Sequence, residues 1–143
     1  MEEVVLALGS NLGDREGYLL HAIELITAEV GEVIRRSSVY ETPSWGFNSF
    51  SFLNQIVVIK TTYSPFLLLE KLQCIERLLG RDKKSSIKDG KSIYRDRTID
   101  IDILFYGNLR MDDERLVIPH PKINEREFIL QPLRELNIDI PEN

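Results

Sequence analysis

The run at residues 97–105, RTIDIDILF, constrains the fold of this chain most, because it is rich in β-forming residues yet contains two carboxylates. Side chains alternate between the two faces of a strand, so Asp100 and Asp102 should point the same way. Two like charges so close together repel each other and are costly to desolvate. We therefore expect a cation between them, and Mg²⁺ fits because one or two carboxylates hold it while phosphates and waters complete its shell. The alternative is an edge strand whose polar face lies in water.

The length of 143 residues predicts one domain that spans residues 1–143. A content of 43% hydrophobic and 29% charged residues is typical of a globular protein, and no apolar run approaches the roughly 20 residues that cross a bilayer. The single cysteine, Cys74, excludes an internal disulfide. Together with the lack of a signal-peptide pattern, it favours a cytoplasmic protein. We expect Cys74 itself to be buried and without a role.

The charge distribution suits a phosphate ligand better than a nucleic acid. The formal net charge of −5 argues against general binding to nucleic acid. The segment from Arg81 to Arg97, however, contains seven Lys and Arg residues and three Asp residues, which gives it a local net charge of +4. The chain has no glycine-rich loop of the Walker type, so phosphates would be held by cationic side chains and a metal ion.

Hydrophobic patterning predicts the order strand, helix, strand, strand, helix, strand. This order is the split βαβ arrangement, an α+β fold described as a ferredoxin-like βαββαβ sandwich, with helices on one face and additional C-terminal elements. The other face of the sheet then needs a cover or a ligand. The predicted elements are strand 4–8, turn 9–14, a helix from Asp14 to Gly31, strands 32–40 and 52–61, a helix from Ser64 to Gly80, strand 98–106, and a short helix at 124–131 that ends before Pro132.

Several polar or aromatic positions have two interpretations each. The connection at residues 41–51 carries the only Trp and two Phe, so it either binds a flat ligand or folds over a small satellite core. Asn54 lies in a predicted strand, and its amide needs partners if that face is buried. Glu76 lies off the apolar stripe of its helix and by default is solvated. His120, between two prolines, is either a turn histidine bonded to the backbone or a ligand-binding side chain.

Motifs along nearly the whole chain resemble, in one order, those of 6-hydroxymethyl-7,8-dihydropterin pyrophosphokinase, an enzyme family of folate biosynthesis. Each motif alone is common, but six in register point to one family. The motifs are Gly9 to Gly13 (GSNLG), Thr42-Pro43 with Trp45-Gly46, Leu53-Asn54, Glu76 with Gly80-Arg81, residues 97–104 (RTIDIDIL), and the stretch from Arg115 through Pro119-His120 to Arg126.

The resemblance implies the ferredoxin-like fold and the transfer of a pyrophosphoryl group from ATP, the co-substrate, to the hydroxymethyl group of the pterin, with release of AMP. It also implies two Mg²⁺ ions, both held by Asp100 and Asp102, which join the triphosphate to the acceptor oxygen. Catalysis would then consist mainly of positioning and charge stabilisation, to which Arg97 contributes. We find no side chain that stands out as a general base.

The resemblance also assigns residues to each substrate. Asn54 would read the hydrogen-bonding edge of the pterin, two phenylalanines would sandwich its ring, and the remaining residues would contact ATP. Lys83 stands where the family often has Arg. The pterin positions are Thr42, Trp45, Phe52, Asn54 and Phe128. The nucleotide positions are Gln73, Glu76, Lys83, Arg97, Ile103, Arg115, His120 and Arg126.

We expect a monomer that binds ATP and the pterin, and neither nucleic acid nor a membrane. A ferredoxin-like binding module without catalysis is the rival interpretation, because this fold has many unrelated functions. Its RNA-binding form would need aromatic residues on the central strands, where this chain has Asp100 and Asp102. An inactive homologue is a further alternative, against which the carboxylate pair and the phosphate-binding cations speak.

Overall fold

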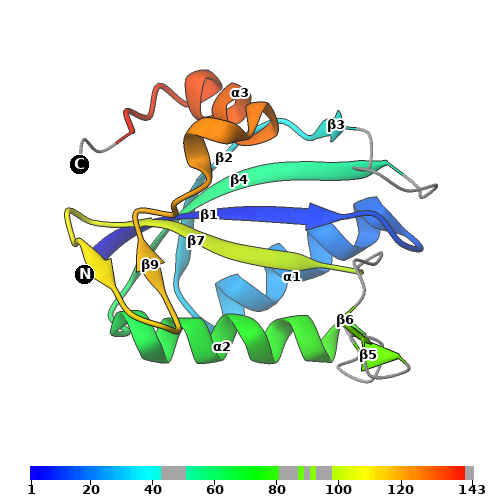
Figure 1. The fold of residues 1–143 in the computed structure, drawn as a ribbon, viewed down its shortest axis with the longest axis horizontal. Helices are drawn as coiled ribbons and strands as arrows, with labels where there is room; N and C mark the ends of the chain where they lie inside the picture. Colours follow the sequence, from blue (N-terminus) through cyan, green and yellow to red (C-terminus); the bar gives the residue numbers. More distant parts are fainter. Residues whose placement is uncertain (43–50, 81–86, 89–90, 93–97, 141–143) are drawn as a thin grey trace.

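The computed structural model describes residues 1–42, 51–80, 87–88, 91–92 and 98–140. They form a main five-stranded antiparallel sheet with helices on both faces, and two separate two-stranded sheets (Figure 1). The sheet has the order β2-β4-β1-β7, and β3 also pairs with β4. This confirms the predicted ferredoxin-like βαββαβ core. The elements are β1 (Glu2–Ser10), α1 (Arg15–Glu29), β2 (Glu32–Arg36), β3 (Tyr40–Thr42), β4 (Phe52–Thr61), α2 (Pro65–Leu78), β5 (Ile87–Lys88), β6 (Lys91–Ser92), β7 (Asp100–Tyr106), β8 (Met111–Asp112), β9 (Val117–Ile118), the 3-10 helix η2 (Ile123–Glu125) and α3 (Glu127–Glu135).

Helices α1 and α2 cover one face of the sheet. The carboxylate of Asp14 caps α1 by accepting a hydrogen bond from the Gly17 backbone N–H at 3.1 Å, and Ser64 caps α2 ahead of Pro65, as the sequence predicts. Leu19 and Ile26 of α1 and Leu72 of α2 are at most 2% exposed. They pack with the inward side chains of the sheet into one apolar cluster, which is the main core.

Helix α3 lies on the opposite face, where it covers a second and smaller apolar cluster (Figure 1). Ile129 and Leu133 of α3 pack there against Val58 of β4 and Leu104 of β7. The short helix was predicted to end before Pro132, but α3 continues to Glu135 with Pro132 inside it. Proline cannot donate a backbone hydrogen bond, which costs the helix stability. Burial of Pro132 and of the following Leu133 outweighs this loss.

Two further predicted boundaries are wrong. The expected strand 32–40 is divided into β2 and β3, because Ser37 turns its side chain to the backbone of β4 between them. The Ser37 hydroxyl accepts from the Ile56 N–H at 2.9 Å, and the Gln55 amide donates to the Ser37 carbonyl at 2.8 Å. The expected turn at 9–14 begins later, since β1 continues to Ser10 and pairs there with Leu53.

Candidate active site

The centre of the site is a row of three residues on three neighbouring strands. Gly9 of β1 pairs with Asp100 of β7 on one side and with Asn54 of β4 on the other. Directly paired residues of antiparallel strands point their side chains to the same face. The carboxylate and the amide therefore lie on the face that α3 partly covers, with the small Gly9 between them.

The two carboxylates of β7 share that face, as predicted. Asp100 and Asp102 are half-buried, whereas Ile101 and Ile103, which alternate with them, are at most 5% exposed and belong to the main core beneath the sheet. Among the described residues, no group of three or more His, Cys, Asp or Glu side chains could hold a metal ion. A cation at this pair would thus need its remaining ligands from a substrate and from water.

Asn54 is 6% exposed, and its amide nitrogen is held by β3. The Nδ2 group donates to the Thr42 hydroxyl at 2.8 Å and, at 3.4 Å, to the Tyr40 carbonyl. The amide oxygen consequently faces Gly9, where a Cβ atom placed on the glycine would lie 3.4 Å from Oδ1. The same Cβ would lie 3.7 Å from the ring of Phe52, so a ring, an amide oxygen and a bare stretch of backbone meet at this point.

His120 is fixed above β7 by its backbone. Its N–H donates to the Leu104 carbonyl at 3.0 Å, and its Nδ1 accepts from the Lys122 N–H at 3.1 Å. Burial lowers the pKa of His120, and the positive charges of Arg126 and Lys122 act in the same direction against the opposing effect of Asp100. The neutral ring then carries its proton on Nε2, which makes that atom a hydrogen-bond donor. The backbone hydrogen bond expected of a turn histidine is therefore present. It uses Nδ1, so it does not exclude the ligand-binding interpretation for Nε2.

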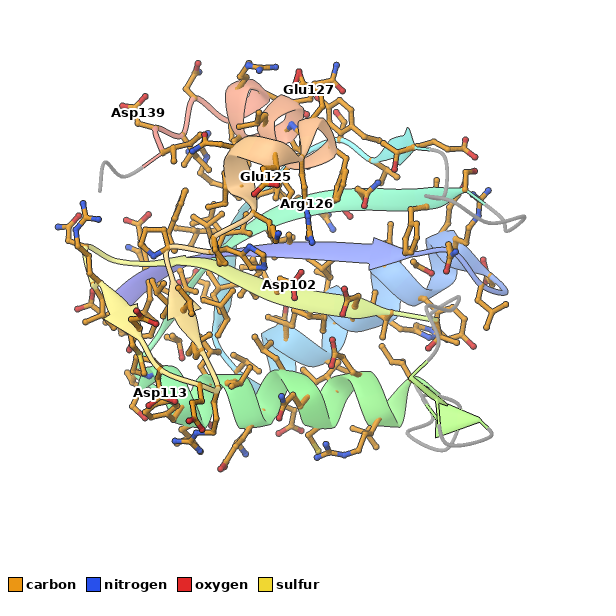
Figure 2. The ribbon with its side chains drawn as sticks, in the orientation of Figure 1. Asp102, Asp113, Glu125, Arg126, Glu127 and Asp139 are labelled. Carbon is orange, nitrogen blue, oxygen red and sulfur yellow. The ribbon has the colours of Figure 1, made fainter. Side chains whose placement is uncertain are left out.

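Arg126, the N-cap residue of α3, brings a guanidinium group to the same region. Figure 2 shows its side chain descending from α3 toward the sheet, in the direction of Asp102. The guanidinium carbon lies 5.7 Å from the centroid of the Phe128 ring. The Phe128 ring packs against the second apolar cluster, so this guanidinium group and this ring lie on the face of the sheet that carries the carboxylates (Figure 2).

Glu76 is not the solvated side chain that its helix position predicts. It is 6% exposed, and its Oε2 accepts a hydrogen bond from the Ile101 N–H at 2.7 Å. Among the described strands, β7 lies at the edge of the main sheet, so this N–H would otherwise have no strand partner there. Glu76 therefore joins α2 to the strand that carries both carboxylates.

The structure brings the other predicted residues together only in part. The Ile103 side chain packs in the main core beneath the sheet, and the Arg115 guanidinium lies 3.9 Å from the centroid of the Phe66 ring of α2. Gln73 is exposed on α2, as is Cys74, which corrects the prediction that the cysteine is buried. The predictions for Trp45, Lys83 and Arg97 fall outside the described residues.

Sequence reasoning missed two features of this site. Gly9 was assigned to a turn, although its position two residues after Ala7 would have placed both on one face of the first strand. The contacts that hold β3 from either side were not predicted, because Arg15 and Glu135 come from helices distant in sequence. Two half-buried carboxylates, one of which lies across a glycine from an amide, suit joint binding of a metal–phosphate group and a flat polar heterocycle.

Comparison with known proteins identifies the family of this chain. The sequence model of the family described as 7,8-dihydro-6-hydroxymethylpterin-pyrophosphokinase matches residues 5–138. The chain is 41% identical over 138 residues to 2-amino-4-hydroxy-6-hydroxymethyldihydropteridine pyrophosphokinase of Porphyromonas gingivalis, covering 95% of this chain and 91% of that protein. It is 42% identical over 133 residues to the Bacillus subtilis protein of the same name, covering 92% and 75%.

Among solved structures, the chain resembles wild-type Plasmodium falciparum HPPK-DHPS, with a TM-score of 0.70 at 18% identity. The match covers 95% of this chain and 40% of that longer one, and it supports the fold alone. In the described part of this chain, no helix has the length and apolar character that a membrane span requires. The family match and the close relatives establish that the chain belongs to the 7,8-dihydro-6-hydroxymethylpterin-pyrophosphokinase family and has that family's activity in folate biosynthesis.

Proposed function

We propose that this chain moves a pyrophosphoryl group from ATP to the hydroxymethyl oxygen of 6-hydroxymethyl-7,8-dihydropterin, with AMP as the second product, on the sheet face that carries Asp100, Gly9 and Asn54. The observation that carries the proposal is the register that sets Asp100 and Asn54 on opposite sides of Gly9. Metal-bound phosphates on one side and a pterin on the other would then meet above the glycine.

Asp100 and Asp102 are the proposed ligands of two Mg²⁺ ions. Their chemistry fits, because Mg²⁺ prefers carboxylate oxygens and fills most of its shell with phosphates and waters. Half-burial of both carboxylates limits access of water without removing it. When bound, the ions would neutralise phosphate charge and orient the acceptor.

The pterin half of the site is proposed to lie over Gly9. Asn54 presents its Oδ1 there and would accept a hydrogen bond from an N–H group at the edge of the ring. Phe52 and Phe128 would pack against the two ring faces, in keeping with the 3.7 Å approach of Phe52 to the Gly9 position. Thr42 and Trp45 are proposed to contribute backbone contacts.

The phosphates are proposed to lie between the carboxylates and the donors of the C-terminal segment. The His120 Nε2–H and the Arg126 guanidinium would donate to phosphate oxygens. A neutral His120 suits this role, because it donates a hydrogen bond without placing another full charge beside Arg126. The further nucleotide residues proposed are Gln73, Glu76, Lys83, Arg97, Ile103 and Arg115.

Within this arrangement the side chains bind and orient rather than transfer protons. Phosphoryl transfer needs reactants held in line and charge stabilised on the phosphate oxygens, both of which positioned donors supply. Arg97 is proposed as the third catalytic residue, because its place in the motif at residues 97–104 matches a phosphate-contacting position of the family.

The test is a product assay with purified protein, ATP and Mg²⁺. AMP and the pterin diphosphate should form together, only when the hydroxymethyl dihydropterin is present, and chelation of the metal should stop the reaction. ADP as product, or binding of the pterin without turnover, would contradict the proposal. Pterin that lacks the hydroxymethyl group is the matched control, because it should bind without forming AMP.

A further inference from the structure

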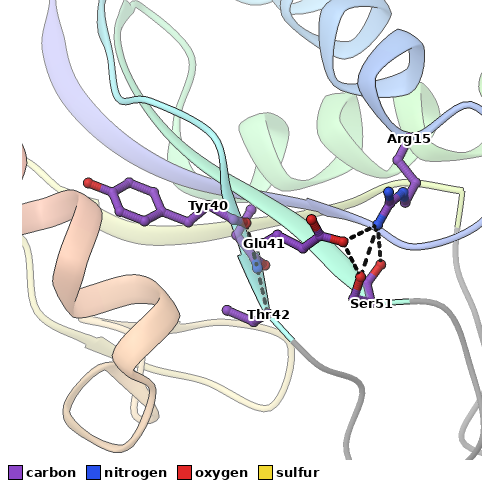
Figure 3. Close-up of polar contacts among 6 residues, drawn as sticks. Arg15, Tyr40, Glu41, Thr42 and Ser51 are labelled. Atoms are coloured by element: carbon purple, nitrogen blue, oxygen red, sulfur yellow. Dashed lines mark hydrogen bonds and ion pairs between the residues drawn. The ribbon is translucent and has the colours of Figure 1, made fainter.

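Strand β3 has only three residues, yet the side chain of each has a polar partner on a different element. Figure 3 shows the contacts of Glu41 and Thr42. We propose that Glu135 of α3 and Arg15 of α1 hold β3 from its two faces, and that this double attachment sets which end of the Asn54 amide faces the substrate. The proposal deepens the pterin site described above and rests on that proposed function. Arg15, Glu41, Tyr40 and Glu135 are then positioning residues that act through Asn54.

The attachment on the α1 side is a three-residue cluster. Arg15 Nη1 donates to Glu41 Oε2 at 3.1 Å, to the Ser51 carbonyl at 2.9 Å and to the Ser51 hydroxyl at 3.1 Å. The Ser51 hydroxyl donates in turn to Glu41. This hydroxyl, and then Arg15, lower the pKa of Glu41. One guanidinium group thereby joins the two sides of segment 43–50, because Glu41 precedes that segment and Ser51 follows it (Figure 3).

The attachment on the α3 side uses one carboxylate. The Tyr40 hydroxyl donates to Glu135 Oε1 at 2.7 Å, while Glu135 Oε2 accepts from the Ser38 N–H at 3.0 Å and from its hydroxyl at 2.9 Å. The Tyr40 hydrogen bond lowers the pKa of Glu135, which stays ionised and acceptor-only. Phe128 lies seven residues, or about two turns, before Glu135 on the same helix. The contact that fixes β3 thus also fixes the helix that carries a pterin-site ring.

Between these attachments, β3 presents two acceptors to Asn54, the Thr42 hydroxyl and the Tyr40 carbonyl. Both engage Nδ2, so Oδ1 is left toward Gly9. A half-turn of the amide would exchange the acceptor for a donor and reverse the hydrogen-bonding pattern offered to the ligand. Selection of a heterocycle that presents N–H groups at this edge therefore depends on where β3 lies.

The contacts between Arg15 and Glu41 should contribute little to the free energy of folding. Glu41 and its partner Arg15 have 57% and 30% of their side-chain surface exposed, and ion pairs in such settings contribute little to folding. Their effect should appear instead in the affinity for the pterin, because a small shift of β3 changes the distance from Thr42 to Asn54.

The experiment compares Glu41→Ala and Tyr40→Phe with the wild-type enzyme, measuring kcat, the KM for the pterin, the affinity for a non-hydrolysable ATP analogue, and Tm. Loss of a positioning hydrogen bond should raise the pterin KM roughly three- to tenfold for Glu41→Ala and about two- to threefold for Tyr40→Phe. The ATP-analogue affinity, kcat and Tm should stay near wild-type values. Glu41→Gln should recover most of the pterin affinity, since its amide oxygen still accepts from Arg15 and Ser51.

The matched control is Arg134→Gln. Arg134 Nη1 lies 3.0 Å from Glu127 Oε1, so this change removes an equally short exposed ion pair that does not touch β3, and it should leave the pterin KM unchanged. A second test introduces Glu41→Ala into Thr42→Val, which lacks the hydroxyl that accepts from Asn54. Because the shorter of the two contacts between β3 and Asn54 is already lost there, Glu41→Ala should add less than about a twofold change.

Failure of this inference differs from failure of the proposed function. If the wild-type enzyme forms no AMP with the pterin, the proposed function is wrong. If it is active but Glu41→Ala leaves the pterin KM unchanged, the positioning role is wrong. Parallel losses of pterin affinity, ATP-analogue affinity and Tm would show a merely structural role and would also overturn it, as would full additivity in the Thr42→Val background.

Discussion

The two faces of the sheet differ in what they are built to do. Beneath it, α1 and α2 bury one continuous apolar cluster that runs the length of the strands. Above it, α3 covers apolar side chains over part of the sheet only, and the remainder carries Asp100, Asp102 and Asn54. Polar side chains on the upper face contribute little to the core, so substitutions there should change activity while substitutions beneath should change stability. Four predictions test this division.

The largest effect on activity is expected for Asp102→Ala. Loss of one of the two proposed metal ligands should lower kcat/KM by about a thousandfold or more, because a bound metal ion contributes several kcal/mol to stabilising the transition state. The Tm should fall little or rise, since removing one of two neighbouring carboxylates relieves repulsion. AMP formation and a thermal melt measure the two quantities. Asp139→Ala, an exposed carboxylate away from the sheet (Figure 2), is the control, and near-normal turnover of Asp102→Ala would refute the metal site.

Leu72→Ala on α2 should have the opposite effect, a loss of stability with little change in activity. Leu72 is fully buried in the main core, so its truncation should cost about 2–5 kcal/mol of the free energy of unfolding. Below the new melting transition, kcat and both KM values should stay close to those of the wild-type enzyme. Urea unfolding and kinetics at low temperature check this. A pterin KM that rises as strongly as stability falls would show that the two faces are not independent.

Gly9→Ala places one methyl group on the site face. Its nearest neighbours, Asn54 Oδ1 at 3.4 Å and the Phe52 ring at 3.7 Å, lie at ordinary contact distances, so the fold should accept it. The methyl group would fill the space where the pterin is proposed to lie, and one such group changes binding by roughly tenfold. We expect a raised pterin KM with unchanged Tm and ATP-analogue affinity, by kinetics and titration. Unchanged pterin affinity would place the pterin elsewhere.

The smallest expected effect is on the Tm at acid pH, through the two carboxylates that attach β3 to the helices, Glu41 and Glu135. Hydrogen bonds hold the pKa of Glu41 and of Glu135 below the ordinary value of 4.5. A carboxyl group with a lowered pKa in the folded state stabilises it above about pH 4.5 and loses that contribution as the pH falls through the folded-state value. The double variant Glu41→Gln, Glu135→Gln should therefore lose less Tm between pH 6 and pH 3 than the wild type. An identical acid limb would contradict the lowered pKa values.

Local signals predicted much of the fold. Strand β4 has the predicted limits of residues 52–61, and both long helices begin at the predicted caps. The alternation of Asp100 and Asp102 with isoleucines likewise predicted one polar and one buried face of β7. These features depend on neighbours within a few residues, which is why periodicity and capping chemistry suffice to find them.

Predictions that needed distant neighbours were less successful. The break at Ser37 depends on Gln55 and Ile56, and the continuation of α3 through Pro132 depends on burial against the sheet. Glu76 was expected in solvent, yet the edge of β7 offers it the Ile101 N–H. In each case a tertiary contact outweighed the local preference.

By itself the sequence determined the order of the elements, the shared face of Asp100 and Asp102, and through its motifs the family. Only the tertiary structure decided that Gly9 separates Asp100 from Asn54, and that Arg15 and Glu135 hold β3 on its two sides. Side-chain alternation is a property of a few consecutive residues, whereas strand register and the orientation of an amide depend on groups that folding alone brings together.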